Sequence, residues 1–386
     1  MIRLTIFAIV LGLVTWLLHR RLVRATGLSR RWARVADSAL VVLWLLTLIG
    51  VGSGEVFDTS WARPIGFTGW VWLASLLYLL VGLLVIGVVS GIGRVVTRRQ
   101  HSGKSDDEPA NPGRRQALRI GTGVVLLGAL ATAGYGVVEA ANPRIVRVRV
   151  PLARLPREFD GVRVALVSDL HVGPARGRAF TRQVVDLIEP ENVDLVAIVG
   201  DVVDGTVAKV SPDLDPLADL HAPLGVFGVS GNHEFYADDG GRWLDVWDRL
   251  GIGTLRNERV ELHRGDAVVD IAGVHDFTSP APYEPDLDAA LAGRDPNRAV
   301  ILLAHQPKHV IEAAEWGVDL QLSGHTHGGQ MWPLGYLVPA QQPSVTGLDR
   351  FGDTTLYTTR GTGAWGPPVR VGTPPEVTIL ELVRES

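Results

Sequence analysis

The stretch Leu195-Val196-Ala197-Ile198-Val199-Gly200-Asp201 decides the fold of this chain. Its apolar residues stop at a Gly-Asp turn, which predicts a strand that is buried on both faces. Residues 145–150 and 162–167 have the β-branched composition of strands, and residues 178–188 have apolar residues at helical spacing. The order strand, helix, strand predicts a βαβ unit of an α/β fold, in which functional side chains gather beyond the carboxyl ends of the strands.

Five polar motifs lie in this part of the chain, and apolar runs lead into most of them. They are Asp169-Leu170-His171, Gly200-Asp201-Val202-Val203-Asp204, Gly231-Asn232-His233-Glu234, the isolated His305, and Gly324-His325-Thr326-His327. They offer carboxylate, amide and imidazole ligands but no thiolate, because the chain contains no cysteine. Such a donor set suits Mn²⁺, Fe²⁺ or Zn²⁺ better than Ca²⁺. Each motif alone occurs often by chance, but all five in this order predict a two-metal hydrolytic site.

The spacing of the ligands predicts how they reach the metals. In an extended segment, side chains two residues apart point to the same side. Asp169 and His171 should therefore reach one metal together. By the same reasoning, His325 and His327 should both reach toward the metal pair. Asp201 has two carboxylate oxygens, which is enough to bridge two cations about 3.5–4 Å apart.

In their order and spacing the motifs resemble the calcineurin-like metallophosphoesterase superfamily, whose pattern is DxH, GDxxD, GNHD/E, an isolated His and GHxH. The resemblance covers roughly residues 145–383. Within the superfamily the chain is most similar to bacterial membrane-associated phosphodiesterases, which include UDP-2,3-diacylglucosamine hydrolase-like and exported phosphoesterases. The resemblance implies a four-layer α/β/β/α sandwich, with two mixed sheets packed face to face and helices outside.

The resemblance also implies a role for each site residue. One metal would be held by Asp169, His171, Asp201 and His327, and the other by Asp201, Asn232, His305 and His325. His233 would not bind metal but would donate a proton or stabilise charge at the phosphoryl group, and Asp204 would orient a ligand. The implied nucleophile is a metal-bridging hydroxide that attacks phosphorus in line.

Several residues outside the motifs have weaker signals. The histidines that match no motif, which we expect to be structural or on the surface, are His221, His263, His275 and His309. Arg176 and Arg178 are expected to be solvated loop residues rather than phosphate ligands, whereas Arg360 could serve either as a phosphate contact or as a structural anchor. For the aromatic residues Trp332, Tyr336 and Trp365, core packing is favoured over a place on a pocket wall or membrane-facing rim.

The first 140 residues predict a membrane region. Four uncharged apolar stretches cover residues 4–18, 38–54, 67–93 and 120–138. About 20 apolar residues are needed to cross a bilayer as a helix, so the first stretch is short and the third is ample. We predict about four transmembrane helices in residues 1–140 and the catalytic domain in residues 141–386.

Two basic segments separate these stretches and predict their orientation. Their cations are Arg20, Arg21, Arg24, Arg30, Arg31 and Arg34 in the first, and Arg94, Arg98, Arg99, Lys104, Arg114, Arg115 and Arg119 in the second. The connection between the second and third stretches carries one cation, Arg63. Positively charged loops stay cytoplasmic, which predicts a multi-pass protein of the cell membrane with an extracytoplasmic catalytic domain.

Charge also limits the partners. Residues 1–150 contain 18 Lys and Arg against 7 Asp and Glu, whereas residues 151–386 contain 19 against 34. A nucleic-acid-binding domain would be expected to carry a basic face, so no nucleic-acid partner is expected for the acidic half.

The sequence therefore predicts a phosphoesterase that hydrolyses a phosphodiester or pyrophosphate bond, on a phospholipid, lipid-linked or nucleotide-sugar substrate at the membrane. The alternative is a catalytically silent scaffold or regulator attached to a membrane module. The complete ligand set and His233 argue against a scaffold. The near absence of charge within the apolar stretches favours an anchor over a transport pathway.

Overall fold

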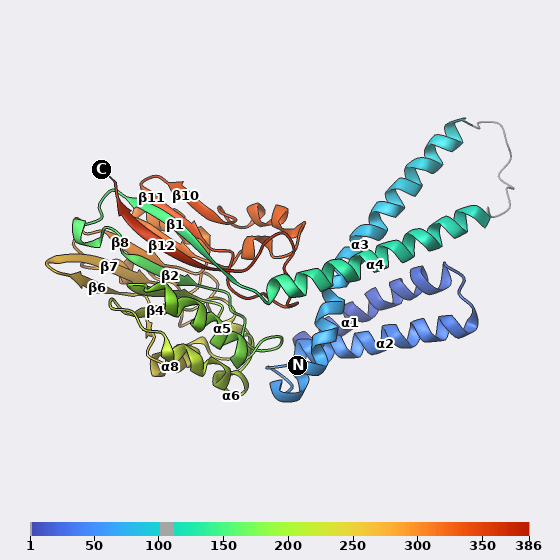
Figure 1. The fold of residues 1–386 in the computed structure, drawn as a ribbon, viewed down its shortest axis with the longest axis horizontal. Coiled ribbons are helices and arrows are strands. Elements are labelled where there is room, and N and C mark those ends of the chain that lie inside the picture. The colour runs from blue at the N-terminus through green and yellow to red at the C-terminus, as the bar shows by residue number, and fades with distance from the viewer. Residues whose placement is uncertain (1, 101–111, 386) are drawn as a thin grey trace.

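The computed structural model describes residues 2–100 and 112–385. A bundle of long helices and a compact α/β part lie end to end (Figure 1). The helices of the bundle are α1 (Ile2–Leu18), α2 (Arg30–Gly52), α3 (Thr59–Gln100) and α4 (Pro112–Ala140). Helix α4 leads directly into strand β1 (Arg144–Leu152) of the α/β part.

All four helices are long and apolar enough to cross a membrane. The first is longer than the sequence predicted, because after Leu18 it continues as the π-helical segment η1 (His19–Arg24) and becomes a 23-residue candidate span. Large apolar side chains cover the outside of the bundle, and Ile9, Leu84 and Leu127 are each about two-thirds exposed. Such a surface suits contact with lipid rather than with water. The second predicted basic segment lies partly outside the described residues.

The α/β part contains two six-stranded mixed sheets. In spatial order the first consists of β1, β12 (Glu376–Arg384), β2 (Arg163–Val167), β3 (Leu195–Val199), β4 (Val226–Val229) and β5 (Gly253–Thr254). The second consists of β10 (Gly347–Phe351), β11 (Thr354–Thr358), β9 (Leu320–Ser323), β8 (Val300–Leu303), β7 (Ala267–Gly273) and β6 (Glu258–Arg264). Within these sheets β2, β3 and β4 are mutually parallel, as are β7, β8 and β9.

Side chains along each strand point alternately to the two faces of the sheet, and this alternation builds the layers. On β3, Leu195, Ala197 and Val199 enter the core between the sheets, where they meet residues of the second sheet such as Leu303 and Leu322. The intervening Val196 and Ile198 pack on the other face, against helices. Successive strand side chains point to opposite faces, so a strand buried on both sides must be continuously apolar. The run at residues 195–199 has this pattern.

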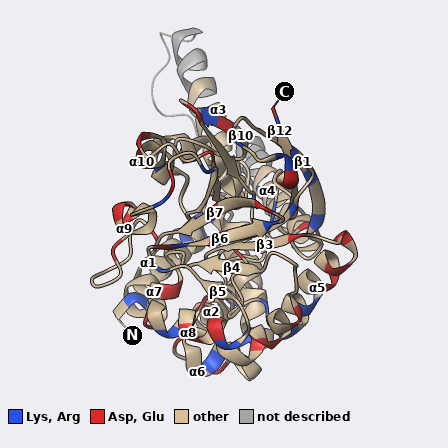
Figure 2. Cartoon of the chain, turned by 90° about the vertical axis from the view of Figure 1, so that its left-hand side faces the viewer, with Lys and Arg blue, Asp and Glu red and all other residues tan. Residues whose placement is uncertain are grey.

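Helices cover both outer faces. On the first sheet these are α5 (Arg178–Ile188), α8 (Gly240–Arg249) and the 3₁₀ segment η4 (Ser211–Asp219), and on the second they are α9 (Leu287–Leu291) and α10 (Val310–Glu315). The fold is therefore the four-layer α/β/β/α sandwich that the sequence predicted. Many acidic residues lie on the outer helices and loops of this part, including α5, α8 and α9 (Figure 2).

Candidate metal centre

The five motifs meet at one edge of the sandwich because each follows a parallel strand. The DxH, GDxxD and GNHE motifs follow β2, β3 and β4 of the first sheet, and His305 and the GHTH motif follow β8 and β9 of the second. Carboxyl ends of parallel strands lie at the same edge, where open α/β sheets place their ligands. Two sheets thus contribute to a single centre.

From the sequence, the segments carrying the ligands are expected to be extended. In the structure they are turns. Five residues of the centre have left-handed backbone: Asp169 (φ 56°), His171 (49°), Asp201 (52°), His325 (69°) and His327 (52°). Left-handed residues bend the chain sharply, and this bending brings the side chains of each motif together. Such a conformation costs roughly 1–2 kcal/mol for a residue other than glycine. Clustered backbone strain of this kind is typical of functional sites.

Glycine in the GHTH motif permits the close approach of two motifs. A Cβ atom on Gly324 would lie 2.0 Å from Oγ of Ser168 and 2.3 Å from Oδ2 of Asp169. Any larger residue at this position would push the β2 and β9 turns apart.

One group of ligand atoms comes from Asp169, His171 and His327, all buried. Nε2 of His327 lies 3.2 Å from Oδ1 of Asp169 and 3.0 Å from Nε2 of His171. Burial, reinforced by the charges of Arg370 and His171, lowers the pKa of His327 to about 4 although Asp169 opposes this shift. A neutral imidazole is the form that binds metal.

A second group comes from Asp201, His305 and His325, joined by Asn232. Oδ2 of Asp201 lies 3.2 Å from Nε2 of His305. Nδ1 of His325 lies 3.3 Å from Nε2 of His305 and 3.0 Å from Oδ1 of Asn232. Oδ2 of Asp201 also lies 3.8 Å from Nε2 of His171, so this carboxylate stands between the two groups.

The hydrogen bonds behind the ligands fit a bound cation. Nδ1 of His305 lies 2.7 Å from the carbonyl oxygen of Val199, which can only accept, so Nδ1 carries the hydrogen. In the neutral ring, the lone pair of Nε2 then faces the carboxylate of Asp201. Two acceptors held this close in a buried site require a proton or a cation between them. The residues therefore fit a metal ion.

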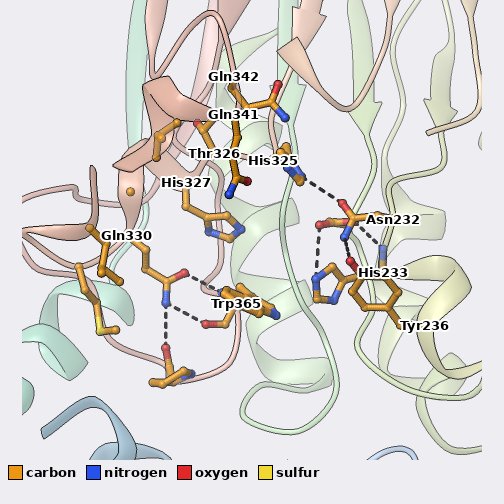
Figure 3. A pocket seen from close by; sticks show the side chains of 16 residues that line it. Asn232, His233, Tyr236, His325, Thr326, His327, Gln330, Gln341, Gln342 and Trp365 are labelled. Carbon is orange, nitrogen blue, oxygen red and sulfur yellow. Dashed lines mark hydrogen bonds and ion pairs between the residues drawn. The ribbon is translucent and has the colours of Figure 1, made fainter. Parts of the chain in front are cut away.

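The remaining amide ligand is oriented in the same way. Nδ2 of Asn232 donates to the hydroxyl of Tyr236 at 2.8 Å, which turns Oδ1 toward His325 (Figure 3). Orientation of ligands by such outer contacts is usual in metal sites.

Ligand atoms of His171, Asp201 and His233 form a third group close enough together to hold a metal ion, and Asp204 lies beside it. Nδ1 of His233 is 2.5 Å from Oδ1 of Asp204, and the same oxygen is 3.1 Å from Nδ1 of His171. Although burial lowers it, the pKa of His233 is raised to about 9 by the carboxylates of Asp201 and Asp204. Without bound metal, these carboxylates therefore favour the protonated form of His233.

The sequence reasoning assigned no role to Glu234, the last residue of the GNHE motif. Its buried carboxylate accepts hydrogen bonds from the backbone N–H groups of Gly231 (2.7 Å), Asp201 (3.1 Å), Val202 (2.9 Å) and Val203 (3.3 Å). It thus ties the turn after β3 to the turn after β4. The sequence did contain a signal for this role, because Glu234 is a carboxylate within a motif whose other polar residues had been assigned.

Arg370 was also missed. Its side chain is completely buried and donates to the carbonyl oxygens of Gly363 (2.6 and 2.9 Å), Arg360 (2.8 Å) and His327 (2.9 Å). A buried guanidinium needs such partners, and here they hold the turn that carries His327. Nothing in the local sequence of Arg370 distinguishes it from a surface arginine.

A cavity of about 370 Å³ opens over the centre. Asp201, Asn232, His233, His325 and His327 line its floor, and Figure 3 shows Trp365, Gln330 and Tyr236 around them. Its upper wall is partly apolar and includes Met331, Leu334 and Val338.

The expectation that three aromatic residues pack in the core is wrong. Trp332, Tyr336 and Trp365 are 57%, 78% and 59% exposed. Trp365 walls the cavity, and Tyr336 lies in the 3₁₀ segment η7 (Leu334–Ala340), of which Leu334 and Val338 line the cavity. Their segments are rich in Pro and Gly, which pack poorly into regular layers, so the rings remain at the surface.

The arginine expectations are corrected in part. Arg176 is not solvated: it is 8% exposed, donates to the carbonyl oxygen of Ala140 and stacks on the ring of Phe180. Arg178 is exposed and paired with Asp215. Arg360 is paired with the buried Glu376 at 3.0 Å, which supports structural anchoring. Among the four unassigned histidines, His275 and His309 are buried, whereas His221 and His263 are exposed.

Comparison with known proteins agrees with this site. Residues 162–329 match the calcineurin-like phosphoesterase family. A transmembrane protein with metallophosphoesterase domain from Danio rerio is 33% identical over 315 residues, covering 79% of this chain and 70% of the relative. An uncharacterized metallophosphoesterase from Helicobacter pylori is 36% identical over 275 residues, covering 70% and 72%. Another from Aquifex aeolicus is 32% identical over 264 residues, covering 67% and 97%.

The fold and the centre define a membrane protein with a metal-dependent hydrolase attached. The chain belongs to the calcineurin-like metallophosphoesterase family, and it is a phosphoric ester hydrolase of the kind that uses divalent metal ions. The Danio rerio match covers more of the chain than the α/β part contains, so the similarity includes some of the membrane region.

Proposed function

We propose that the enzyme binds two divalent cations, Mn²⁺, Fe²⁺ or Zn²⁺, which share Asp201. The ligands would be Asp169, His171, Asp201 and His327 for one cation, and Asp201, Asn232, His305 and His325 for the other. Bound there, the cations would neutralise phosphoryl oxygens and lower the pKa of a bound water toward neutrality. The observation that carries the proposal is the set of buried acceptor atoms facing one another across Asp201.

His233 is the proton donor in this proposal. Asp204 holds its Nδ1, so Nε2 is left to face the substrate. The protonated ring can then give its proton to the leaving oxygen as the phosphorus–oxygen bond breaks. Proton transfer from a positioned group contributes about 10²–10⁴-fold to a rate.

We propose a phosphodiester or pyrophosphate as substrate. No lysine or arginine is among the described residues that line the cavity, and much of its wall is apolar. A phosphomonoester carries nearly two negative charges at neutral pH, whereas a phosphodiester carries one and brings a second organic group. The lining therefore suits a phosphodiester better than a phosphomonoester, whereas a pyrophosphate, which carries two charges, has no such advantage.

We propose that the substrate is associated with the membrane, as a phospholipid, lipid-linked or nucleotide-sugar intermediate, and that the catalytic domain is extracytoplasmic. The loop after η1 lies at the end of the bundle far from the α/β part, whereas the N-terminus and the turn between α2 and α3 lie beside it (Figure 1). With basic loops inside, the catalytic part lies outside. The boundary between membrane region and catalytic domain falls, in this proposal, between residues 140 and 141.

The test uses the full-length protein in detergent, stripped of metal and reloaded with Mn²⁺. We expect faster hydrolysis of bis(p-nitrophenyl) phosphate than of p-nitrophenyl phosphate, and loss of both activities in Asp201→Asn. The control Asp266→Asn changes an exposed turn of the β6–β7 hairpin and should leave both rates as they are. If the protein binds two metals per chain and hydrolyses neither ester, the scaffold alternative gains support.

A further inference from the structure

A second cavity, of about 310 Å³, lies where the helix bundle meets the catalytic part. The bundle contributes wall residues from α1, the end of α2, the following turn and α3, among them the polar Arg3, Ser53 and Glu55 and the apolar Leu4, Phe7, Val56 and Trp70. The catalytic part contributes residues that include Pro174, Asp204, His233, Tyr236 and Trp365. The membrane helices therefore help to form a cavity that reaches the catalytic histidine.

This cavity adjoins the one over the metal centre. His233, Tyr236 and Trp365 line both. His233 thus stands between a chamber with the metal ligands on its floor and a second chamber at the ends of the helices, whose wall is mainly apolar but also holds Arg3 and Glu55. A molecule that fills both chambers needs a phosphoryl group at one end and an apolar group at the other.

Arg3 links helix α1 to the metal centre. Its Nη1 donates to the backbone carbonyl of Tyr236 at 2.6 Å, and its guanidinium carbon lies 5.5 Å from the centroid of the Tyr236 ring. The hydroxyl of Tyr236 in turn accepts from the ligand Asn232. The start of the first helix is therefore attached to the turn that carries a metal ligand.

Further polar contacts hold the two parts together around the cavity. Arg63 on α3 donates to the carbonyl oxygen of Gly173 at 2.7 Å and pairs with Asp213. Lys209 donates to the carbonyl oxygen of Glu55 at 2.6 Å. On the far side, Ala74 and Ala133 pack against Met331 and Val369. These contacts fix how the helix bundle meets the catalytic part, so the cavity between the two is a defined feature of the fold.

We propose that this second cavity binds the hydrocarbon chain of an amphiphilic phosphoester whose phosphoryl group lies at the metal centre. The inference rests on the proposed function and adds a binding site built by the membrane helices. A hydrocarbon chain fits apolar walls such as Leu4, Phe7 and Trp70, because burying apolar surface of both partners away from water stabilises the complex. The lipid-facing helices also place the cavity where a chain from the bilayer can enter.

A cross-linking experiment tests occupancy without relying on turnover. The probe is a hexadecylphosphonate with a diazirine near the end of its chain, added to full-length protein in nanodiscs. We expect adducts on residues 3–7 and around Trp70, displaced by excess hexadecylphosphonate but not by methylphosphonate. Leu4→Trp and Val56→Trp, which fill the cavity from two walls, should abolish these adducts. Ile9→Trp, on a lipid-facing position of α1, is the matched control and should not. Adducts confined to lipid-facing positions, or insensitive to both filling variants, would overturn the inference.

Kinetics separate this inference from the proposed function. The substrates are two diesters with one leaving group, p-nitrophenyl hexadecyl phosphate and p-nitrophenyl methyl phosphate. In Leu4→Trp, the ratio of their kcat/KM values should move at least about tenfold toward the methyl ester, which corresponds to about 1.4 kcal/mol. An unaltered ratio with an active enzyme contradicts the chain-binding site and leaves the proposed function standing. A wild-type protein inactive on both esters contradicts the proposed function, and the cross-linking pattern then still decides whether the chain binds.

Discussion

Oδ1 of Asp204 lies 2.5 Å from Nδ1 of His233, so one partly buried carboxylate holds an imidazole that lines the cavity over the metal ligands. The same oxygen also contacts the metal-ligand candidate His171 at 3.1 Å. Asp204 thereby couples the orientation of the proton donor to that of a ligand.

Replacement of His233 should slow chemistry without removing metal. We expect His233→Asn to lower kcat by about 10²–10⁴-fold, the range typical of a lost general acid. Two metals per chain should remain, measured by inductively coupled plasma mass spectrometry. Loss of metal together with activity would instead make His233 a ligand.

Asp204→Asn should have a mixed effect. Both imidazoles contact Oδ1 of Asp204, and an uncharged amide oxygen accepts hydrogen bonds more weakly than a carboxylate oxygen. Both rings are then held less firmly, and His233 loses a charge partner. We expect activity or metal affinity to fall about 10–100-fold, as is usual for outer-sphere changes at metal sites. Titration of metal-free protein with Mn²⁺ and steady-state rates at saturating Mn²⁺ separate the two effects. Rates and affinity equal to wild type would contradict the coupling.

The number of metal ions bound per chain should show whether Asp201 is shared by the two metal sites. Asp169→Asn should weaken one site and Asn232→Ala the other, each leaving about one metal per chain at limiting Mn²⁺. Asp201→Asn should weaken both, because its carboxylate stands between the two groups. If Asp201→Asn retained one tightly bound metal, Asp201 would belong to a single site.

Glu234→Ala should destabilise the fold as well as the site. Four backbone N–H groups lose their acceptor, and a buried donor left without a partner costs about 1–3 kcal/mol. We expect a lower midpoint of thermal unfolding even for metal-free protein. Glu234→Gln keeps one acceptor oxygen and should lose less. Equal midpoints for wild type and Glu234→Ala would show that the tie between the two turns is dispensable.

The buried His309 should make stability depend on pH. Burial lowers the pKa of His309 to about 4, below its ordinary value of 6.5. The unfolded chain therefore binds more protons than the folded chain between these values, and stability falls as pH drops from about 6.5 to 4. The shift corresponds to roughly 3 kcal/mol. Metal-free His309→Leu should lose less thermal stability than metal-free wild type between pH 7 and 5, and an equal loss in both would contradict this.

Labelling can test the orientation, because the chain contains no cysteine of its own. In spheroplasts, a membrane-impermeant maleimide should label Asp266→Cys in the catalytic part. Ser29→Cys, in the exposed loop before α2, should react only after the membrane is opened. The reverse pattern would place the catalytic domain in the cytoplasm.

The sequence by itself determined individual strands and helices and the membrane spans, whereas the four layers were expected from the family resemblance. Strand and helix periods depend on local spacing, so α5 and β3 have the predicted bounds, residues 178–188 and 195–199. Uncharged stretches identified the four spans for the same reason. The motifs also named the residues that the structure brings to one edge, because the residue types alone limit which side chains can bind metal.

Only the tertiary structure decided how these residues meet and what surrounds them. The left-handed turns at Asp169 and Asp201 are imposed by packing against other turns, which local sequence does not encode. Arg176 is buried because α4 ends above it and Phe180 lies beneath it. The contact of Arg3 with Tyr236 joins residues more than two hundred positions apart. Such contacts depend on how separate elements dock, and no pattern within one segment records that.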